Sequence, residues 1–289
     1  MKRCVRCASE FDTASWACPT CGFEPASLNG HFAFAPTLAC GGEGFEDSYF
    51  QELAQLESGN FWFRARNRLI LWALKKYFAD AKNLLEIGCG TGFVLSGIAA
   101  TFPDINLSGS EVSASGLGYA AQRVPGATFF QMDARSIPFV GEFDAIGAFD
   151  VIEHIEQDEA VLAQMFAALK PGGGLLLTVP QHPFLWSEMD VGAHHVRRYR
   201  ADELKRKVTQ AGFEVVEMAS FVSLLLPLMY ASRLTQRKVR DDYDVMAELR
   251  LHPAVNFALE KILAVERGLI RLGVRFFCGG SLLLVARKA

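Results

Sequence analysis

The sequence lacks an excess of positive charge and any strict repeat. Its 289 residues include 29 basic and 32 acidic side chains, a formal net charge of −3. A protein that grips duplex nucleic acid by neutralising phosphates is expected to be basic, so the composition argues against that class. The 25 glycines and 11 prolines follow no period, which excludes collagen-like and low-complexity chains.

Long hydrophobic runs are also missing. The longest strongly apolar stretch without a charge, 218–232, contains Pro227 and is shorter than the roughly 20 residues that span a bilayer. The start, Met1-Lys2-Arg3-Cys4, leads into polar residues rather than the apolar core of a secretory signal. We therefore expect a cytoplasmic protein. Hydrophobic residues make up 51% of the chain, which excludes wholesale disorder.

The chain has 7 cysteines, an odd number that does not suit a complete disulfide framework, and four lie in the first 21 residues. They form two Cys-x-x-Cys knuckles separated by ten residues, a spacing that lets four thiolates close a tetrahedral shell around zinc. The sequence therefore predicts a structural zinc ribbon over residues 1–24. The alternatives are four reduced thiols in a disordered tail, or an iron centre. The predicted ligands are Cys4, Cys7, Cys18 and Cys21.

Beyond the cysteines, residues 25–48 have the composition of a linker, and from residue 49 onward the chain is typical of a folded domain. Apolar strands alternate with helical segments from residue 83, which predicts an α/β domain with a parallel sheet covered on both faces. An apolar, helical insertion at about 221–275 precedes the last strand. The expected strands are 83–87, 105–110, 127–132, 143–149, 175–179, 213–219 and 281–286.

A glycine-rich turn follows the first of these strands. The run 84–92 ends with glycines at positions 88, 90 and 92, which let the backbone approach a ligand and adopt positive φ. The dinucleotide fingerprint Gly-x-Gly-x-x-Gly fails because position 93 is Phe. The next helix presents its free N–H groups to negative ligand atoms.

Three acids accompany this turn. Glu86 lies inside the strand end, where a buried carboxylate needs a partner. Glu111 follows the second strand, where an acid can hold ribose hydroxyls. Asp133 follows the third strand, where it suits an adenine-type amine.

With these residues the chain resembles the class I S-adenosylmethionine-dependent methyltransferases, over roughly 61–220 and again at the final strand. The resemblance implies a Rossmann-like sheet of seven strands, six parallel and the last antiparallel, in a domain spanning 49–289. It also implies S-adenosylmethionine as the cofactor. A nucleotide-binding domain of another kind, such as an oxidoreductase, is the alternative. The cofactor-binding residues expected are Glu86, Gly88, Cys89, Gly90, Gly92, Glu111, Asp133, Ala134 and Phe149.

The resemblance implies in-line transfer of an activated methyl group, so holding two reactants collinear and excluding water is the main task. A general base is needed only for a hydroxyl or protonated amine acceptor. The candidates are His154 and His195, each of which also has a plain structural explanation as a cap or a loop anchor. The run Asp150-x-x-Glu153-His154 resembles the metal-binding run of some O-methyltransferases, which have Glu in place of Asp150, so a catalytic cation stays open.

The acceptor is not identified by the sequence. We expect a small molecule or a glycan or lipid-linked precursor, with RNA as the less favoured acceptor. A non-catalytic, zinc-headed scaffold is a further alternative. The insertion at 221–275 is compatible with peripheral membrane contact, although packing against the domain or dimerisation explains the same apolar residues. The oligomeric state stays open.

Overall fold

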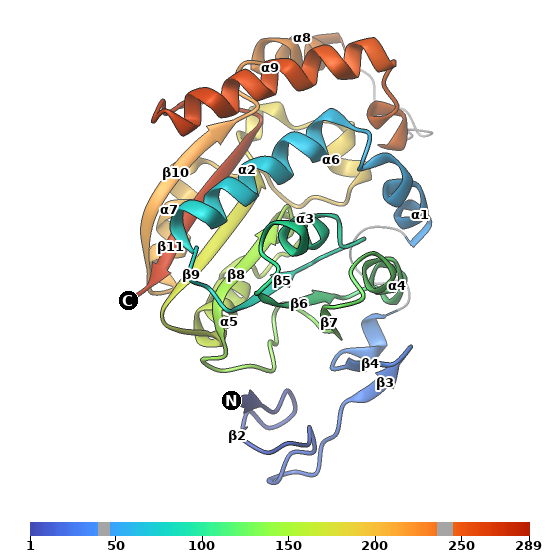
Figure 1. Cartoon of the computed structure of the whole chain (residues 1–289), viewed down its shortest axis with the longest axis vertical. Coiled ribbons are helices and arrows are strands. Elements are labelled where there is room, and N and C mark those ends of the chain that lie inside the picture. The colour runs from blue at the N-terminus through green and yellow to red at the C-terminus, as the bar shows by residue number, and fades with distance from the viewer. Residues whose placement is uncertain (40–46, 236–244) are drawn as a thin grey trace.

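A computed structural model describes residues 1–39, 47–235 and 245–289. A mixed sheet forms its centre, with helices on both faces (Figure 1). The strands lie in the order β10-β11-β9-β8-β5-β6-β7-β4-β3. Their bounds are β3 (Ala26–Leu28), β4 (His31–Ala33), β5 (Asn83–Ile87), β6 (Asn106–Glu111), β7 (Thr128–Gln131), β8 (Phe143–Phe149), β9 (Leu169–Pro180), β10 (Phe213–Phe221) and β11 (Ser281–Lys288).

The seven-stranded pattern expected from the sequence forms the main part of this sheet. Neighbouring strands from β7 through β6, β5 and β8 to β9 pair in parallel. The last strand, β11, inserts antiparallel between β9 and β10. The prediction of a Rossmann-like α/β fold is therefore confirmed.

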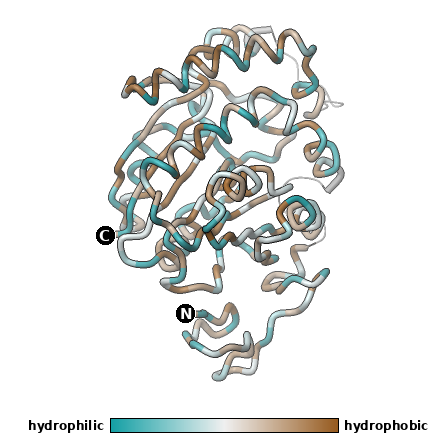
Figure 2. The backbone as a smooth tube through the Cα atoms, viewed as in Figure 1, coloured by the Kyte–Doolittle hydropathy of each residue, from teal (hydrophilic) through white to brown (hydrophobic). Residues whose placement is uncertain are grey.

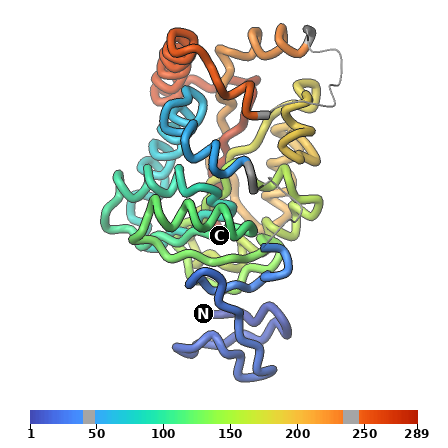
Figure 3. Tube along the Cα trace, turned by 90° about the vertical axis from the view of Figure 1, so that its right-hand side faces the viewer, coloured from blue at the N-terminus to red at the C-terminus, as the bar shows by residue number. Residues whose placement is uncertain are grey.

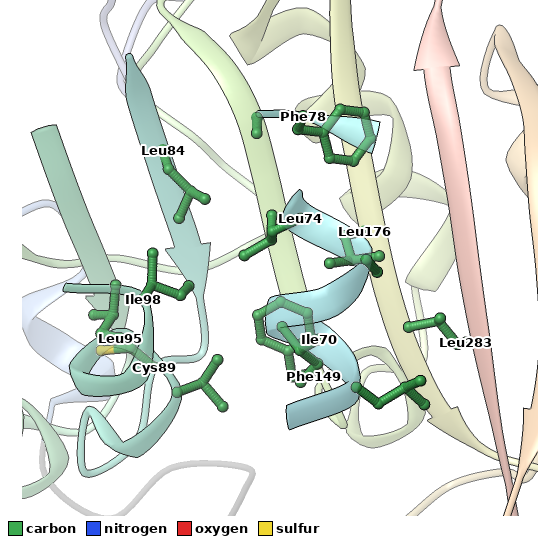
Figure 4. Packing of buried hydrophobic residues seen from close by; sticks show 14 of the residues in the cluster. Ile70, Leu74, Phe78, Leu84, Cys89, Leu95, Ile98, Phe149, Leu176 and Leu283 are labelled. Carbon is green, nitrogen blue, oxygen red and sulfur yellow. The ribbon is translucent and has the colours of Figure 1, made fainter. Parts of the chain in front are cut away.

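Side-chain alternation along the strands builds a core on each face. Leu84 and Leu176 point to one face, and their neighbours Leu85 and Leu177 point to the other. Figure 4 shows the first face, where Leu74 of a covering helix packs over the sheet. Because both faces are buried, the central strands read as continuous apolar runs.

Helices α2, α3, α4 and α9 contribute to the first core, and α5 and α7 contribute to the second. The insertion contains α8, a short 3-10 turn and α9, and α9 packs along α2. Within the described residues, no helix is long and apolar enough to cross a membrane. The helices are α1 (Asp47–Leu56), α2 (Phe61–Tyr77), α3 (Phe93–Thr101), α4 (Ala114–Arg123), α5 (Asp158–Ala168), α6 (Glu188–Gly192), α7 (Ala201–Gln210), α8 (Leu226–Thr235) and α9 (Pro253–Arg271).

The range expected as a linker, 25–48, contains a hairpin that extends the sheet. Asn29 and Gly30 both have positive φ, which favours the tight turn between β3 and β4. β4 then pairs in parallel with β7, so the sheet has two strands more than expected. Residues 40–46 of this range, including Cys40, lie outside the described residues.

The N-terminal head, residues 1–24, sits against the body beside this hairpin (Figure 3). Its strands β1 (Lys2–Arg3) and β2 (Glu10–Phe11) form a small antiparallel ladder. Trp16 packs edge-on against Phe34 and Phe139, with ring centroids 4.8 and 5.5 Å apart. The backbone N–H of Arg3 donates to the carbonyl of Pro138 at 3.0 Å. The head is therefore docked on the segment that follows β7.

Candidate functional site

A cavity of about 1370 Å³ opens at the carboxyl ends of the parallel strands. Its floor is the glycine turn after β5 and the loops after β6, β7 and β8, and α1, α8 and α9 contribute to its walls. Open α/β sheets bind ligands at this edge. Of the nine residues predicted to hold the cofactor, all but Gly92 line this cavity.

Glycine is needed at the three positions of the turn for different physical reasons. A Cβ on Gly88 would lie 2.5 Å from Val151, and one on Gly92 would lie 2.9 Å from the Cα of Ala120, so both are required by packing. The Cβ position of Gly90 meets nothing in the described protein closer than Phe50, at 3.9 Å. Gly90, at φ +52°, therefore leaves room on the cavity side of the loop.

Glu111 binds this loop from the end of β6. The backbone N–H of Gly90 donates to its Oε2 at 3.0 Å, and the N–H of Val112 donates to its Oε1 at 2.8 Å. The carboxylate thus lies directly beside the glycine turn, at the cavity wall.

Glu86 lies deeper, at the end of β5. Its side chain is buried, and its Oε2 has no hydrogen-bond partner. Burial raises the pKa of Glu86 well above its ordinary value, although the nearby Arg66 opposes the shift. Arg66 itself pairs with Asp150 and stacks over the ring of Trp62 at 4.5 Å. Asp150, which has a positive φ of 58°, is thereby engaged with the arginine.

A buried ion pair that the sequence analysis missed fixes α1 and the residues just after it over the glycine turn. Arg123 Nη1 donates to Glu57 Oε2 at 2.7 Å, and the hydroxyl of Thr91 donates to the same oxygen at 2.6 Å. Burial raises the pKa of Glu57, against the opposing contacts from Thr91 and Arg123. No sequence signal links positions 57 and 123, because they meet only through the fold.

Asp133 and Ala134, predicted to bind the adenine, follow β7 and line the cavity. Asp133 accepts hydrogen bonds from the backbone N–H of Arg135 at 2.8 Å and from its guanidinium. Gln131, which the sequence analysis did not single out, is fully buried and its amide donates to the carbonyls of Ala35 and Val112. It therefore ties the hairpin to the loop that carries Glu111.

Both predicted catalytic histidines line the same cavity and meet each other. The rings of His154 and His195 are edge to face, with centroids 4.7 Å apart. His195 Nδ1 lies 2.9 Å from Asp190 Oδ1, and Arg198 Nε donates to the same oxygen at 2.7 Å. Burial works to raise the pKa of Asp190, but its contacts with His195 and Arg198 lower it overall. The Asp190 carboxylate favours the tautomer in which Nδ1 donates to it and Nε2 faces away as the acceptor.

Glu153 completes this cluster. It is fully buried, neither carboxylate oxygen has a hydrogen-bond partner, and Oε1 lies 4.0 Å from His195 Nε2. Burial and the neighbouring Asp150 raise the pKa of Glu153 well above its ordinary value. Burial, together with the nearby His195, lowers the pKa of His154 to about 3. Ligand atoms of Glu153, His154 and His195 all lie within 4.8 Å of one another.

The four N-terminal cysteines also converge. Their sulfur atoms lie within 4.8 Å of one another, with Cys4 and Cys21 3.6 Å apart and Cys7 and Cys18 3.7 Å apart. Separations of this size fit the edges of a tetrahedron with sulfurs about 2.3 Å from a central zinc. The head is therefore compatible with a small zinc-binding module.

The comparison with protein families agrees with this geometry. Residues 54–218, which include the glycine turn and all three strand-end acids, match the model of a family described as a methyltransferase domain. The chain belongs to this methyltransferase family. A trans-aconitate 2-methyltransferase of Deinococcus radiodurans is 27% identical to the methyltransferase domain over 188 residues, which cover 64% of this chain and 68% of the relative.

Two further relatives match shorter stretches. A trans-aconitate 2-methyltransferase of Paracidovorax citrulli is 34% identical over 104 residues, 35% of this chain and 40% of the relative. An O-methyltransferase of Penicillium expansum is 27% identical over 162 residues, 52% of this chain and 58% of the relative. The matched stretches thus span between 40% and 68% of the length of these three curated relatives.

Solved structures share the fold. A phosphoethanolamine N-methyltransferase of Haemonchus contortus, in complex with phosphomonomethylethanolamine and S-adenosylhomocysteine, superposes with a TM-score of 0.51 at 20% identity, covering 76% of this chain and 52% of that one. The [4+2]-cyclase SpnF superposes with a TM-score of 0.54 at 23% identity, covering 78% and 83%. Because this fold also carries a cyclase, the fold alone does not fix the reaction of a methyltransferase-family chain.

Proposed function

We propose that this protein is an S-adenosylmethionine-dependent methyltransferase. One observation carries the proposal: the open space at Gly90, the unpaired oxygen of Glu86 and the carboxylate of Glu111 all border one cavity. Together they offer a close backbone approach, a buried acceptor for an amino group and an acid for ribose hydroxyls. The unpaired oxygen of Glu86 can accept a hydrogen bond from the ammonium of an amino-acid tail, whereas a pyrophosphate offers it no such donor, so these residues favour a nucleoside with an amino-acid tail over a dinucleotide.

Each predicted cofactor residue has a place in this proposal. Glu86 receives the amino group of the tail, and Glu111 receives the ribose hydroxyls. Asp133 and Ala134 border the adenine, and Gly88, Cys89, Gly90 and Phe149 border the remainder, while Gly92 supports the turn by its packing on α4. S-adenosylmethionine, when bound, supplies a methyl group already activated by a positive sulfur. The protein's task is to hold the acceptor in line and to exclude water.

We place the acceptor at the cluster of Glu153, His154 and His195, which borders the same cavity. His154, with a pKa lowered to about 3, is a weak base. His195 is better suited, because Asp190 orients it and leaves Nε2 free to accept a proton from an acceptor hydroxyl or ammonium. The runner-up is a divalent cation at the cluster, favoured by the two unpartnered oxygens of Glu153. Asp150 is not part of that site, because it pairs with Arg66.

The acceptor we propose is a small molecule or a glycan or lipid-linked precursor. The trans-aconitate methyltransferases and the O-methyltransferase among the relatives support a small acceptor. The acidic net charge gives RNA less support. A non-catalytic scaffold is not favoured, because the glycine turn and all three acids are present at one cavity.

We also propose that the head holds one structural zinc through Cys4, Cys7, Cys18 and Cys21. Four sulfurs leave no open position on the metal, so the ion would stabilise the head rather than take part in methyl transfer. A head of 24 residues buries little surface of its own, so the metal would supply much of its folding free energy.

Calorimetric titration of the full chain tests the proposal. We expect S-adenosylmethionine to bind with one site per chain, and NAD to show no binding at the same concentrations. Binding of NAD in preference to the sulfonium nucleoside would contradict the proposal. The acceptor is then sought by transfer of a labelled methyl group to fractionated cell extract, with a Glu86→Gln variant as the control for chain-dependent labelling.

A further inference from the structure

The outer face of α9 carries apolar side chains that no other part of the described protein covers. Val265 is 59% exposed and Ile262 37% exposed, and they follow Ala258 at helical spacing. The stripe continues beyond the helix, where Leu272 is 84% exposed and Phe277 90% exposed. The inner face of the same helix is separate, because Leu263 and Ile270 are buried in the core. The helix is therefore apolar on two faces, and only one of them is packed.

The exposed stripe is bordered by positive charge. Lys261 stacks over the ring of Phe257 at 4.9 Å, and Arg271 is exposed in the last turn of the helix. Arg275, in the loop after the helix, pairs with Glu217 of β10 at 3.2 Å. The two acids of the segment 253–278 are not exposed: Glu266 is buried, and Glu260 pairs with arginines of α2. The exposed part of this fully described segment therefore carries cations without acids, on a chain whose net charge is −3.

Other residues of α9 and of its neighbour α8 border the cavity. Leu259 of α9 and Leu228 of α8 line the cavity, while Leu228 is also 58% exposed to solvent. The two helices lie together at one end of the molecule, opposite the N-terminal head (Figures 1 and 2). Exposed apolar side chains with a cationic border match the composition of helices that lie in a lipid interface.

We propose that the outer face of α9 and the loop 272–278 dock the protein on an anionic membrane surface. Phe277, Leu272 and Val265 would enter the boundary between headgroups and acyl chains, and Lys261 and Arg271 would face the anionic headgroups. A second copy of the chain fits this face less well, because a self-complementary contact would bring the same cations together with no exposed acid to meet them.

Docking in this position also indicates an acceptor class. An amphiphile could keep its tail in the bilayer while its polar head reaches the cavity that α8 and α9 border. This second statement rests on the proposed methyltransferase function, whereas docking itself does not. The two are separated experimentally, because vesicle binding is measured without cofactor or acceptor.

Co-sedimentation of the full chain with vesicles tests the docking. We expect the chain to bind vesicles of phosphatidylcholine that contain about 30% phosphatidylglycerol. Binding to vesicles of phosphatidylcholine alone should be roughly tenfold weaker. Binding to the anionic vesicles should also weaken roughly tenfold in about 0.5 M salt, which screens the charges. Leu272→Asp and Arg271→Glu should each weaken binding by roughly tenfold, since both side chains are exposed and leave the core intact. Val216→Asp, an exposed apolar position on β10, is the matched control and should bind as the natural chain does.

Absence of vesicle binding by the natural chain would overturn the proposal. So would a dimer in sedimentation equilibrium that Leu272→Asp dissociates, because the face would then be an interface between copies. If vesicles bind as expected but calorimetry shows no affinity for S-adenosylmethionine, the docking surface stands and the methyltransferase proposal fails.

Discussion

His195 and Asp190 form a hydrogen-bonded pair, with Nδ1 and Oδ1 2.9 Å apart, and the pair is held in place by Arg198. This arrangement leaves Nε2 of His195 toward Glu153 and the cavity. The loop that follows β9 therefore has a defined chemical role, because Asp190 selects the tautomer of His195.

Replacing His195 tests whether its side chain acts as the general base that removes a proton from the methyl acceptor. His195→Gln keeps a polar side chain but removes the base, so we expect the turnover number for a hydroxyl acceptor to fall by roughly 100-fold. Affinity for S-adenosylmethionine should not change, because the cofactor residues lie at other strand ends. Steady-state kinetics and calorimetry measure the two effects. His31→Gln, in the remote hairpin, is the control. Equal loss of turnover and of cofactor affinity would point to a structural role.

Gly90 offers a sharper test of the cofactor site than the other two glycines. Ala at this position meets only Phe50 at 3.9 Å in the protein, so the added methyl crowds the ligand rather than the core. Its positive φ adds a cost of about 1 kcal/mol to folding. We expect the affinity for S-adenosylmethionine to fall at least tenfold, with the unfolding transition still cooperative. Gly118→Ala on α4, where a Cβ has open space, should leave the affinity unchanged.

The sequence predicted most of the elements that form this site, because the glycine turn and the acids at positions 86, 111 and 133 are local signals at strand ends. Contacts between residues that are far apart in the sequence could not be predicted in this way. The contact between Glu57 and Arg123 joins segments 66 residues apart, and no periodicity reveals it. The hairpin at Asn29-Gly30 did have a local turn signal, but glycine and proline around it resembled a linker.

Burial of Glu153 predicts a pH dependence of stability. Its pKa is raised in the folded protein, so the folded state keeps a proton that the unfolded chain releases above about pH 4.5. The stabilising contribution is fully present below the unfolded pKa and is lost as the pH rises toward the folded pKa. Gln has no proton to lose, so the free energy of unfolding of Glu153→Gln, measured by urea unfolding, should fall less between about pH 5 and about pH 8.

The control for this experiment is Glu214→Gln, because Glu214 is an exposed residue of β10. Glu86 contributes a decline of the same sign in every variant, so it cancels in the comparison. An identical decline in Glu153→Gln and the natural chain would contradict the assignment of Glu153 as a buried titrating group. The same variant also tests whether the cluster of Glu153, His154 and His195 binds a divalent cation. If it does, Mn²⁺ should stabilise the natural chain but not Glu153→Gln.

Removal of the zinc proposed for the head is predicted to act on the body as well. The four sulfurs converge on one point, and Trp16 joins the head to Phe34, Phe130 and Phe139. Cys18→Ser removes a buried ligand, so we expect the zinc content to fall from one ion per chain to well below one. Because the backbone N–H of Arg3 donates to Pro138 in the segment after β7, hydrogen exchange should then accelerate at residues 136–140 as well as in the head.

The matched control is Cys278→Ser, at an exposed cysteine outside the head, which should keep both the zinc and the protection from exchange. Full protection at 136–140 in a metal-free Cys18→Ser protein would show that the head's attachment depends on Trp16 packing alone.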